Sequence, residues 1–179
     1  VESELGLIPK GWEVVELKEI VKRLTPKNRY RKNEVVDFGK IPVFEQGNDL
    51  LMGFHNNKPD FVASPEQPKF IFGDHTCNMR LICEPFSVGP NVIPLIGKGL
   101  PNIWVYYSAR GKQTFQEYRR HWMEFKIKKA VKSNSRLLVN YFAGFSKSIL
   151  EAKNLNFHEI LQLKFCRRAL LNHFFQKYK

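Results

Sequence analysis

The sequence predicts an α/β protein of the α+β kind: a globular domain of short mixed strands and helices, followed by a long projecting helix of the coiled-coil type. Three observations predict this. Short β-branched and aromatic runs, punctuated by Gly, Pro, Asn and Asp, fill residues 39–100. No proline interrupts residues 136–178, where apolar residues recur at helical spacing. The 179 residues, 43% of them hydrophobic, suffice for one domain plus an extension, which we place at 1–132 and 133–179.

The first predicted element follows a Pro-Lys-Gly turn at residues 9–11. Val14 and Val15 can begin an extended segment, and from Glu16 the 3-to-4 spacing of apolar residues predicts a short helix. Pro26 ends this helix. Residues 27–33, KNRYRKN, are polar and basic, so we expect them to form an exposed loop.

The middle of the chain is typical of several short strands joined by tight turns and polar loops. Residues 102–114 then predict a short helix that ends near Gly111. The aromatic residues that follow recur every three or four positions, which favours packing between the domain and the long helix, and an alternating, strand-like tail comes next. The aromatic residues expected in this packing are Tyr118, Trp122 and Phe125.

The C-terminal segment predicts a single helix with a heptad-like apolar stripe. Its 43 residues would span roughly 65 Å, which is too long to lie wholly on a small domain, so we expect it to project and pair with another helix. Ser133, Asn134 or Ser135 could cap its start. A helical hairpin broken near Gly144 or residues 154–156 and a membrane-surface helix are the alternatives. The stripe residues expected to pack against a partner are Leu138, Phe142, Phe145, Ile149, Leu163 and Leu170.

The formal net charge of +12 is unevenly distributed. Residues 108–179 hold 16 basic and 4 acidic residues, whereas residues 1–107 are balanced. Residues 22–32 nevertheless carry six basic residues and no acid. Such a cationic field attracts polyanions, which favours nucleic acid as a partner over a role in solubility alone.

Polar loops supply the candidate contacts to DNA. Arg and Asn have the geometries that read guanine and adenine, whereas Lys, Arg and Tyr can also hold phosphates without reading a sequence. A merely solvated loop remains the alternative at each place. The candidate DNA-binding residues are Lys27, Asn28, Arg29, Arg31 and Lys32, then Gln46 and Asn48, then His55, Asn56, Asn57 and Lys58, and finally Arg110 and Lys112.

The stretch FIFGDHTC, residues 70–77, places reactive side chains side by side. A zinc site would need a second pair of ligands at suitable spacing, and no His or Cys supplies one, so we expect no metal site. A small nuclease or thiol hydrolase that uses Asp74, His75 and Cys77 is the alternative function.

The three cysteines form no framework, which suits a reducing cytoplasm. No apolar run approaches the length of a membrane span, and no secretory signal is present, so we expect no membrane partner. The first residue is Val rather than Met, which suggests a piece of a longer chain.

Taken in order, several segments resemble the DNA-specificity subunit of type I restriction-modification enzymes. The likeness covers essentially the whole chain. This chain departs from the family in two ways. Residues 131–138, VKSNSRLL, stand where that family usually has a proline-containing segment. The family also has two recognition domains and two helical regions, whereas this chain has one of each. The segments that carry the resemblance are SELGLIPKGWEVVELKEIV, GKIPVFEQGNDLLMGF, FIFGDHTC, PFSVGPNV, QEYRRHWMEF and the apolar C-terminal helix.

The resemblance implies a non-catalytic half subunit, in which residues 1–132 form a target-recognition domain and residues 133–179 a conserved helical region. It implies that Gly73 permits a sharp turn after a strand and that Asp74 or Thr76 bonds to that turn locally. The partners it implies are double-stranded DNA with a bipartite target, methyltransferase subunits, a restriction-translocase subunit, and a second copy or the other half of the subunit, paired through antiparallel helices.

The resemblance also implies that cofactors bind elsewhere. We expect S-adenosylmethionine, ATP and Mg on partner subunits and none in this chain, because it has no Asn-Pro-Pro-Tyr-type motif and no phosphate-binding Gly-x-x-x-x-Gly-Lys loop. The expected location is the cytoplasm, in association with the nucleoid.

Overall fold

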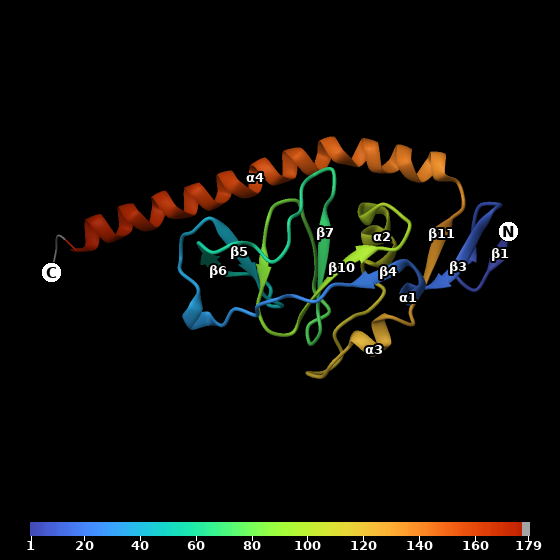
Figure 1. The fold of residues 1–179 in the computed structure, drawn as a ribbon, viewed down its shortest axis with the longest axis horizontal. Helices are drawn as coiled ribbons and strands as arrows, with labels where there is room; N and C mark the ends of the chain where they lie inside the picture. Colours follow the sequence, from blue (N-terminus) through green and yellow to red (C-terminus); the bar gives the residue numbers. More distant parts are fainter. Residues whose placement is uncertain (177–179) are drawn as a thin grey trace.

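A long helix lies across one side of a globular unit built from small, mainly antiparallel sheets (Figure 1). The computed structural model describes the backbone of residues 1–176 and the side chains of residues 1–163 and Cys166. Strands and helices alternate along the chain as follows: β1 (Glu2–Ser3), β2 (Gly6–Leu7), β3 (Trp12–Glu16), α1 (Leu17–Ile20), β4 (Val21–Arg23), η1 (Lys32–Glu34), β5 (Ile41–Phe44), β6 (Leu51–His55), β7 (Lys69–Gly73), β8 (Met79–Ile82), β9 (Ser87–Val88), β10 (Val92–Gly97), α2 (Asn102–Ala109), α3 (Trp122–Phe125), β11 (Lys129–Ser133) and α4 (Arg136–Gln176).

The central sheet has four antiparallel strands in the order β4-β10-β7-β8. A second sheet has the order β6-β5-β9, in which β5 and β9 run parallel. β3 pairs antiparallel with β11 in a separate ribbon, and β1 with β2 in a short hairpin. The structure therefore has the α+β fold that the short strands and turns of the sequence predict.

Both faces of the central sheet are buried, which explains the continuous apolar run of β7. Phe70 and Phe72 lie in a core with the residues of α1, α2 and α3, while Ile71 between them faces a second core with Phe44 and Phe86 of the other sheet. Alternation of side chains along a strand produces this division. Because both faces of this sheet are covered, its strands contact a large partner through the loops at their ends.

One of the two short helices predicted in the domain differs from the structure and the other is confirmed. The helix expected from Glu16 to Leu24 is only the single turn α1, because the chain returns to an extended strand at Val21 and pairs with Gly97 of β10. The short helix expected to end near Gly111 is confirmed as α2.

Helix α4 is unbroken over 41 residues, as predicted, and is about 60 Å long at 1.5 Å per residue. The Oγ atom of Ser135 accepts a hydrogen bond from the Leu138 amide at 3.3 Å, so Ser135 is the cap among the three candidates. As predicted, the helix is too long to lie wholly on the domain. Val139, Ser146 and Leu150 are buried against the globular unit, and only the end of α4 passes beyond it (Figure 1).

Within the part of the chain that the structure describes, no helix combines the length and the apolar character needed to cross a bilayer.

Candidate nucleic-acid interface

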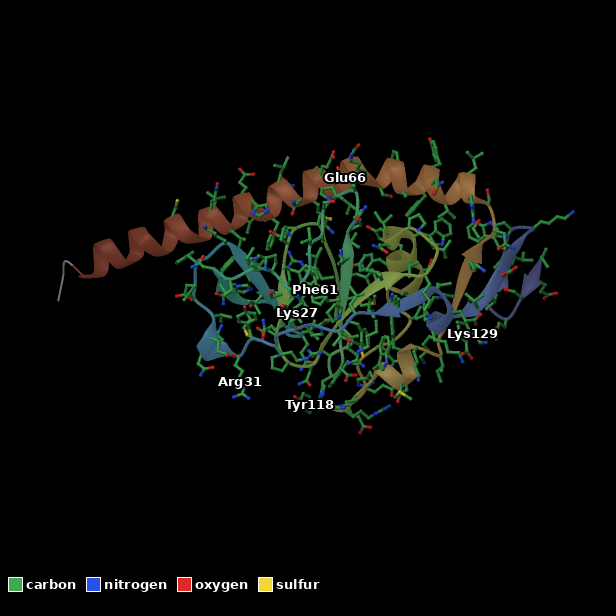
Figure 2. All side chains as sticks on the ribbon, viewed as in Figure 1. Lys27, Arg31, Phe61, Glu66, Tyr118 and Lys129 are labelled. Atoms are coloured by element: carbon green, nitrogen blue, oxygen red, sulfur yellow. The ribbon has the colours of Figure 1, made fainter. Side chains whose placement is uncertain are left out.

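The candidate interface is the edge of the globular unit that lies opposite α4. Arg31 and Tyr118 lie along this edge, on the far side of the sheets from the long helix (Figure 2). The loops after β4, β5 and β6, the turn after β7 and the loop before α3 supply its residues.

The loop after β4 is exposed, as its sequence predicts, except at Tyr30, and two of its side chains also hold it to the domain. The guanidinium of Arg29 donates to the carbonyl oxygens of Gly89 at 3.1 Å and Val92 at 2.9 Å. Burial lowers the pKa of Arg29, without removing its charge. The Nζ atom of Lys32 donates to the Met52 carbonyl at 2.7 Å. Lys27, Asn28 and Arg31 remain exposed and free to meet a ligand.

His55 and Tyr30 form a buried platform beneath the loop that follows β6. Their rings stack with centroids 4.2 Å apart, and the Nε2 atom of His55 lies 2.9 Å from Ser87 Oγ. Burial lowers the pKa of His55, so the ring is neutral near pH 7. The side chain of His55 therefore supports the loop and does not reach its surface. Asn56, Asn57 and Lys58 are the exposed residues above it.

Gln46 is also directed inward, where it anchors the turn after β7. Its side-chain oxygen accepts a hydrogen bond from the His75 amide at 3.0 Å, and its carbonyl oxygen accepts one from Thr76 Oγ1 at 2.7 Å. Asn78 Nδ2 donates to the same carbonyl at 3.0 Å and lies 3.5 Å from Asn48 Oδ1. The loop after β5 and the turn after β7 thus form one unit, from which Asn48 is exposed.

The GDHTC turn is occupied by contacts within the fold. Asp74 Oδ1 accepts a hydrogen bond from the Trp122 amide at 2.9 Å, and Thr76 bonds to Gln46. The left-handed residue is Cys77, with φ of 60°, and not Gly73 as expected. Gly73 is needed for space instead, because a Cβ there would lie 2.8 Å from Gln46 Cβ.

The chemistry of the turn does not suit a nucleophile. Burial, together with the charges of Glu124 and Asp74, raises the pKa of the Cys77 thiol to about 11, so it is protonated at neutral pH. Among the residues whose side chains are described, no three His, Cys, Asp or Glu residues gather as a metal site requires. A structural role accounts for the turn.

Tyr118 was expected to pack in the core, and that expectation is wrong. Its side chain is 74% exposed and lies over the ring of His75, with centroids 4.7 Å apart. Trp122 and Phe125 do pack, on Phe72 of the central sheet and not under α4. The charged neighbours of Tyr118, such as Arg120, were the signal that this part of the aromatic pattern faces solvent.

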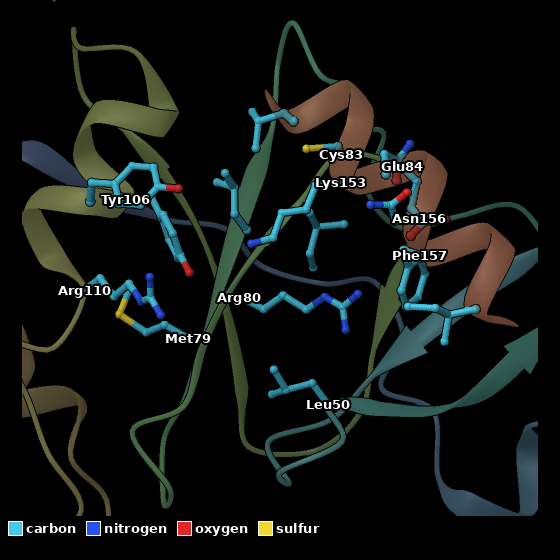
Figure 3. A pocket seen from close by; sticks show the side chains of 16 residues that line it. Leu50, Met79, Arg80, Cys83, Glu84, Tyr106, Arg110, Lys153, Asn156 and Phe157 are labelled. Carbon is cyan, nitrogen blue, oxygen red and sulfur yellow. The ribbon is translucent and has the colours of Figure 1, made fainter. Parts of the chain in front are cut away.

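Arg110 and Lys112 lie elsewhere. Both follow α2, and Arg110 lines a hollow beneath α4 instead of joining these loops (Figure 3). Besides the anchored Arg29 and Lys32, seven predicted residues together with Tyr118 and Arg120 are therefore the exposed members of the candidate interface; the seven are Lys27, Asn28, Arg31, Asn48, Asn56, Asn57 and Lys58.

Helix α4 has a second apolar side whose residues are exposed within the part of the chain that the structure describes. Phe145 is 67% exposed, Ile149 54% and Leu163 63%, and Leu138 is also exposed. Phe142 differs from them, because its ring packs on Trp104 at 5.4 Å between centroids. Leu170, the last residue of the predicted stripe, lies outside the residues whose side chains are described.

This arrangement of sheets, loops and a single long helix matches solved structures of one kind. The S subunit of a type I restriction-modification system from M. genitalium superposes with a TM-score of 0.60 and 16% sequence identity, over 90% of this chain and 45% of that chain. The chain has the fold of half a type I S subunit. The S-subunit fold thus confirms the likeness that the order of the sequence segments indicates.

A chain from work on the complex assembly and conformational transition of a type I restriction-modification system is a weaker match, with 15% identity, a TM-score of 0.47, and coverage of 93% of this chain and 46% of that one. This chain thus spans slightly less than half the length of both structures. No protein-family model matches the sequence, and no curated protein sequence matches it.

Proposed function

We propose that this chain is a DNA-recognition module of a type I restriction-modification system, acting as one half of a specificity subunit. The observation that carries the proposal is the S-subunit fold combined with exposed basic, amide and aromatic side chains on the edge opposite α4. Cationic side chains bind phosphates, and amide and guanidinium groups match base edges in the major groove. The module itself catalyses nothing. S-adenosylmethionine, ATP and Mg bind to partner methyltransferase and restriction subunits.

The second part of the proposal concerns the exposed side of α4. Fully burying a large apolar side chain contributes roughly 1.5 to 3 kcal/mol, so the exposed Phe145, Ile149 and Leu163 favour a partner. We assign that place to an antiparallel helix from a second copy or from the other half of a full subunit. Such a pair sets two recognition domains at a fixed distance and gives a bipartite DNA target.

Methylation-site mapping tests the proposal in cells that carry this chain with its methyltransferase subunits. A bipartite sequence should emerge, and duplex DNA with that sequence should bind the complex about 1,000-fold or more tightly than random duplex at the same salt. Exchanging the loop after β4 or the loop before α3 should change one half of the target only. If no methylated sequence emerges, or if the methylated sequence stays the same after both loop exchanges, this face does not recognise DNA.

A further inference from the structure

A hollow of about 430 Å³ lies between β8, α2 and α4 (Figure 3). This volume falls within the range of small-molecule sites, ~300 to 1,000 Å³. Its lining comes from segments far apart in the sequence: Leu50 in the loop after β5, β8 and the residues after it, the end of α2, and the middle of α4.

The charge of the hollow is predominantly positive. Arg80 comes from β8, Arg110 follows α2, and Lys153 reaches in from α4 (Figure 3). Glu84 is the one acidic residue of the described lining, and its carboxylate is already 3.2 Å from His158 Nε2. Three cations thus face a space in which one carboxylate is already paired, so the hollow favours an anion.

The guanidinium of Arg80 is positioned by two aromatic rings, and its N–H groups have no hydrogen-bond acceptor among the described residues. Its guanidinium lies over the rings of Phe44 at 4.8 Å and Phe157 at 4.4 Å. Among the described residues it has no hydrogen-bond or ion-pair partner. Ring contacts on the faces of a guanidinium leave the N–H groups at its edge free, and these fit two oxygens of a phosphate at once.

The remainder of the lining is aromatic and apolar. Tyr106 and Tyr107 flank the hollow on the side of α2, and Met79, Leu150 and Ile160 complete it. Planar rings stack on aromatic side chains irrespective of their exact identity. We propose that this hollow binds a small organic phosphate of the nucleoside monophosphate class, with its phosphate on Arg80 and Lys153 and its ring beside the two tyrosines.

The proposed ligand would contact α4 and the globular unit at once. Its binding would hold the helix against the domain and would act on the geometry of the long helix, and none of the exposed residues of the candidate interface lines the hollow. The site is thus independent of the DNA-recognition role, and either proposal can fail alone.

Calorimetric titration of the full chain tests this site. Each of the four ribonucleoside monophosphates, the matching uncharged nucleosides and inorganic phosphate are titrated separately at low salt. We expect one or more monophosphates to bind at one site with a Kd below about 100 µM. The nucleosides and inorganic phosphate should each bind at least about tenfold more weakly, since each lacks one half of the interaction.

Two variants and one control assign the binding to the hollow. Lys153→Gln lies on an exposed part of α4 and should fold normally, and both it and Arg80→Gln should weaken binding about tenfold or more. Arg136→Gln removes an exposed arginine from the first turn of the same helix and should leave binding unchanged. Three results would overturn the proposal. None of the monophosphates shows saturable binding up to about 1 mM, the nucleosides bind as tightly as the monophosphates, or Lys153→Gln binds the monophosphate with unchanged affinity. A loss confined to duplex DNA binding would instead assign these cations to the DNA backbone and also overturn it.

Discussion

The Nε2 atom of His158, on α4, lies 3.2 Å from the Oε2 atom of Glu84, in the segment that follows β8. A second ion pair, Lys147 with Glu66 at 2.9 Å, joins the same helix to the loop before β7. Between them Leu150 is buried against the domain. These contacts fix α4 along the globular unit over several turns, so the direction of the helix and the position of the loops opposite are linked.

The buried carboxyl of Glu84 gives a dependence of stability on pH. Burial raises its pKa, and the nearby His158 and Arg80 only partly oppose this shift. A carboxyl with a raised folded-state pKa favours the folded state below its ordinary pKa, and this contribution is lost as pH rises through the raised value. We therefore expect Glu84→Gln to raise the Tm at pH 8 by on the order of 2 °C and to show a smaller gain at pH 4.

Glu66→Gln is the matched control for this measurement, with the opposite sign. A hydrogen bond from Lys147 lowers the pKa of Glu66 to about 2, so its contribution is present above the ordinary glutamate pKa and is lost as pH falls toward 2. Because the site is exposed, screening by water keeps the effect small. If Glu84→Gln raises the Tm above that of the wild type by less at pH 8 than at pH 4, the assignment to Glu84 is contradicted.

The close contact of Gly73 with the loop after β5 predicts a costly substitution. A Cβ at this position would lie 2.8 Å from Gln46 Cβ, and Gln46 is itself held by the turn. Gly73→Ala should lower the free energy of unfolding by about 1 to 3 kcal/mol, measured by urea denaturation. Gly144→Ala is the control: nothing lies within 4 Å of its Cβ, and it should stabilise α4 by roughly 0.5 to 1 kcal/mol.

Two arginines of one loop should have separable effects. Arg29→Ala removes hydrogen bonds to two carbonyl oxygens and should cost about 2 kcal/mol or more of folding stability. Arg31→Ala should leave stability within about 0.5 kcal/mol and weaken DNA binding by about 1 to 3 kcal/mol if the side chain reads a guanine. Urea denaturation and fluorescence anisotropy on the mapped DNA target measure the two effects. Equal loss of DNA affinity in stably folded Arg29→Ala would show that Arg29 also meets DNA.

We expect the side chain of Tyr118 to contribute to DNA binding and not to folding stability. Its ring is exposed above His75, beside Arg120, so Tyr118→Ala should change the free energy of unfolding by less than about 0.5 kcal/mol. The same substitution should weaken DNA binding by about 1 to 3 kcal/mol if the ring stacks on a base. Phe115→Ala is a useful comparison, since Phe115 is also exposed and contacts His121 instead. Identical anisotropy curves for the wild type and Tyr118→Ala would exclude the contact.

The exposed side of α4 predicts association through the helix. Phe145→Asp combined with Leu163→Asp should convert a dimer into monomers in sedimentation experiments and abolish the bipartite target. Far-UV circular dichroism should show that the globular unit stays folded. Asn140→Asp, exposed on a different side of α4, should change nothing. A wild-type monomer at tens of micromolar in the absence of other subunits would refute self-pairing.

The parts of the fold that could be predicted are those whose sequence pattern is compatible with only one local structure. A stretch without proline and with helical periodicity has few alternatives, and α4 is one unbroken helix. The FIF run of β7 is apolar at every position, and such a strand must be covered on both sides. The side of α4 that meets the domain was harder, because Ser146 lies among its buried residues while Phe145, next to it, is exposed. A helix with two apolar sides does not indicate which partner lies within the chain.

The candidate interface could be predicted only as a set of loops. Arg29 and Arg31 have the same chemistry two positions apart, yet one donates to carbonyls of the β9–β10 connection, some 60 residues away in the chain, and the other faces solvent. His55 resembled a DNA-binding residue until the stack with Tyr30 placed it inside. Such choices depend on which distant backbone groups lack a partner, and local spacing carries no information about that.

The pairing of β3 with β11 has a consequence for how such a protein can diversify. Five successive residue pairs, from Trp12 with Ser133 to Glu16 with Lys129, join the first strand of the globular unit's larger ribbon to its last. The polypeptide therefore enters and leaves the unit side by side (Figure 1). Genetic recombination at these two neighbouring points could replace everything between them as a cassette, and insertions at the far edge would not redirect the helix that follows. A lineage could thus acquire a new set of loops in one event while inheriting the scaffold unchanged.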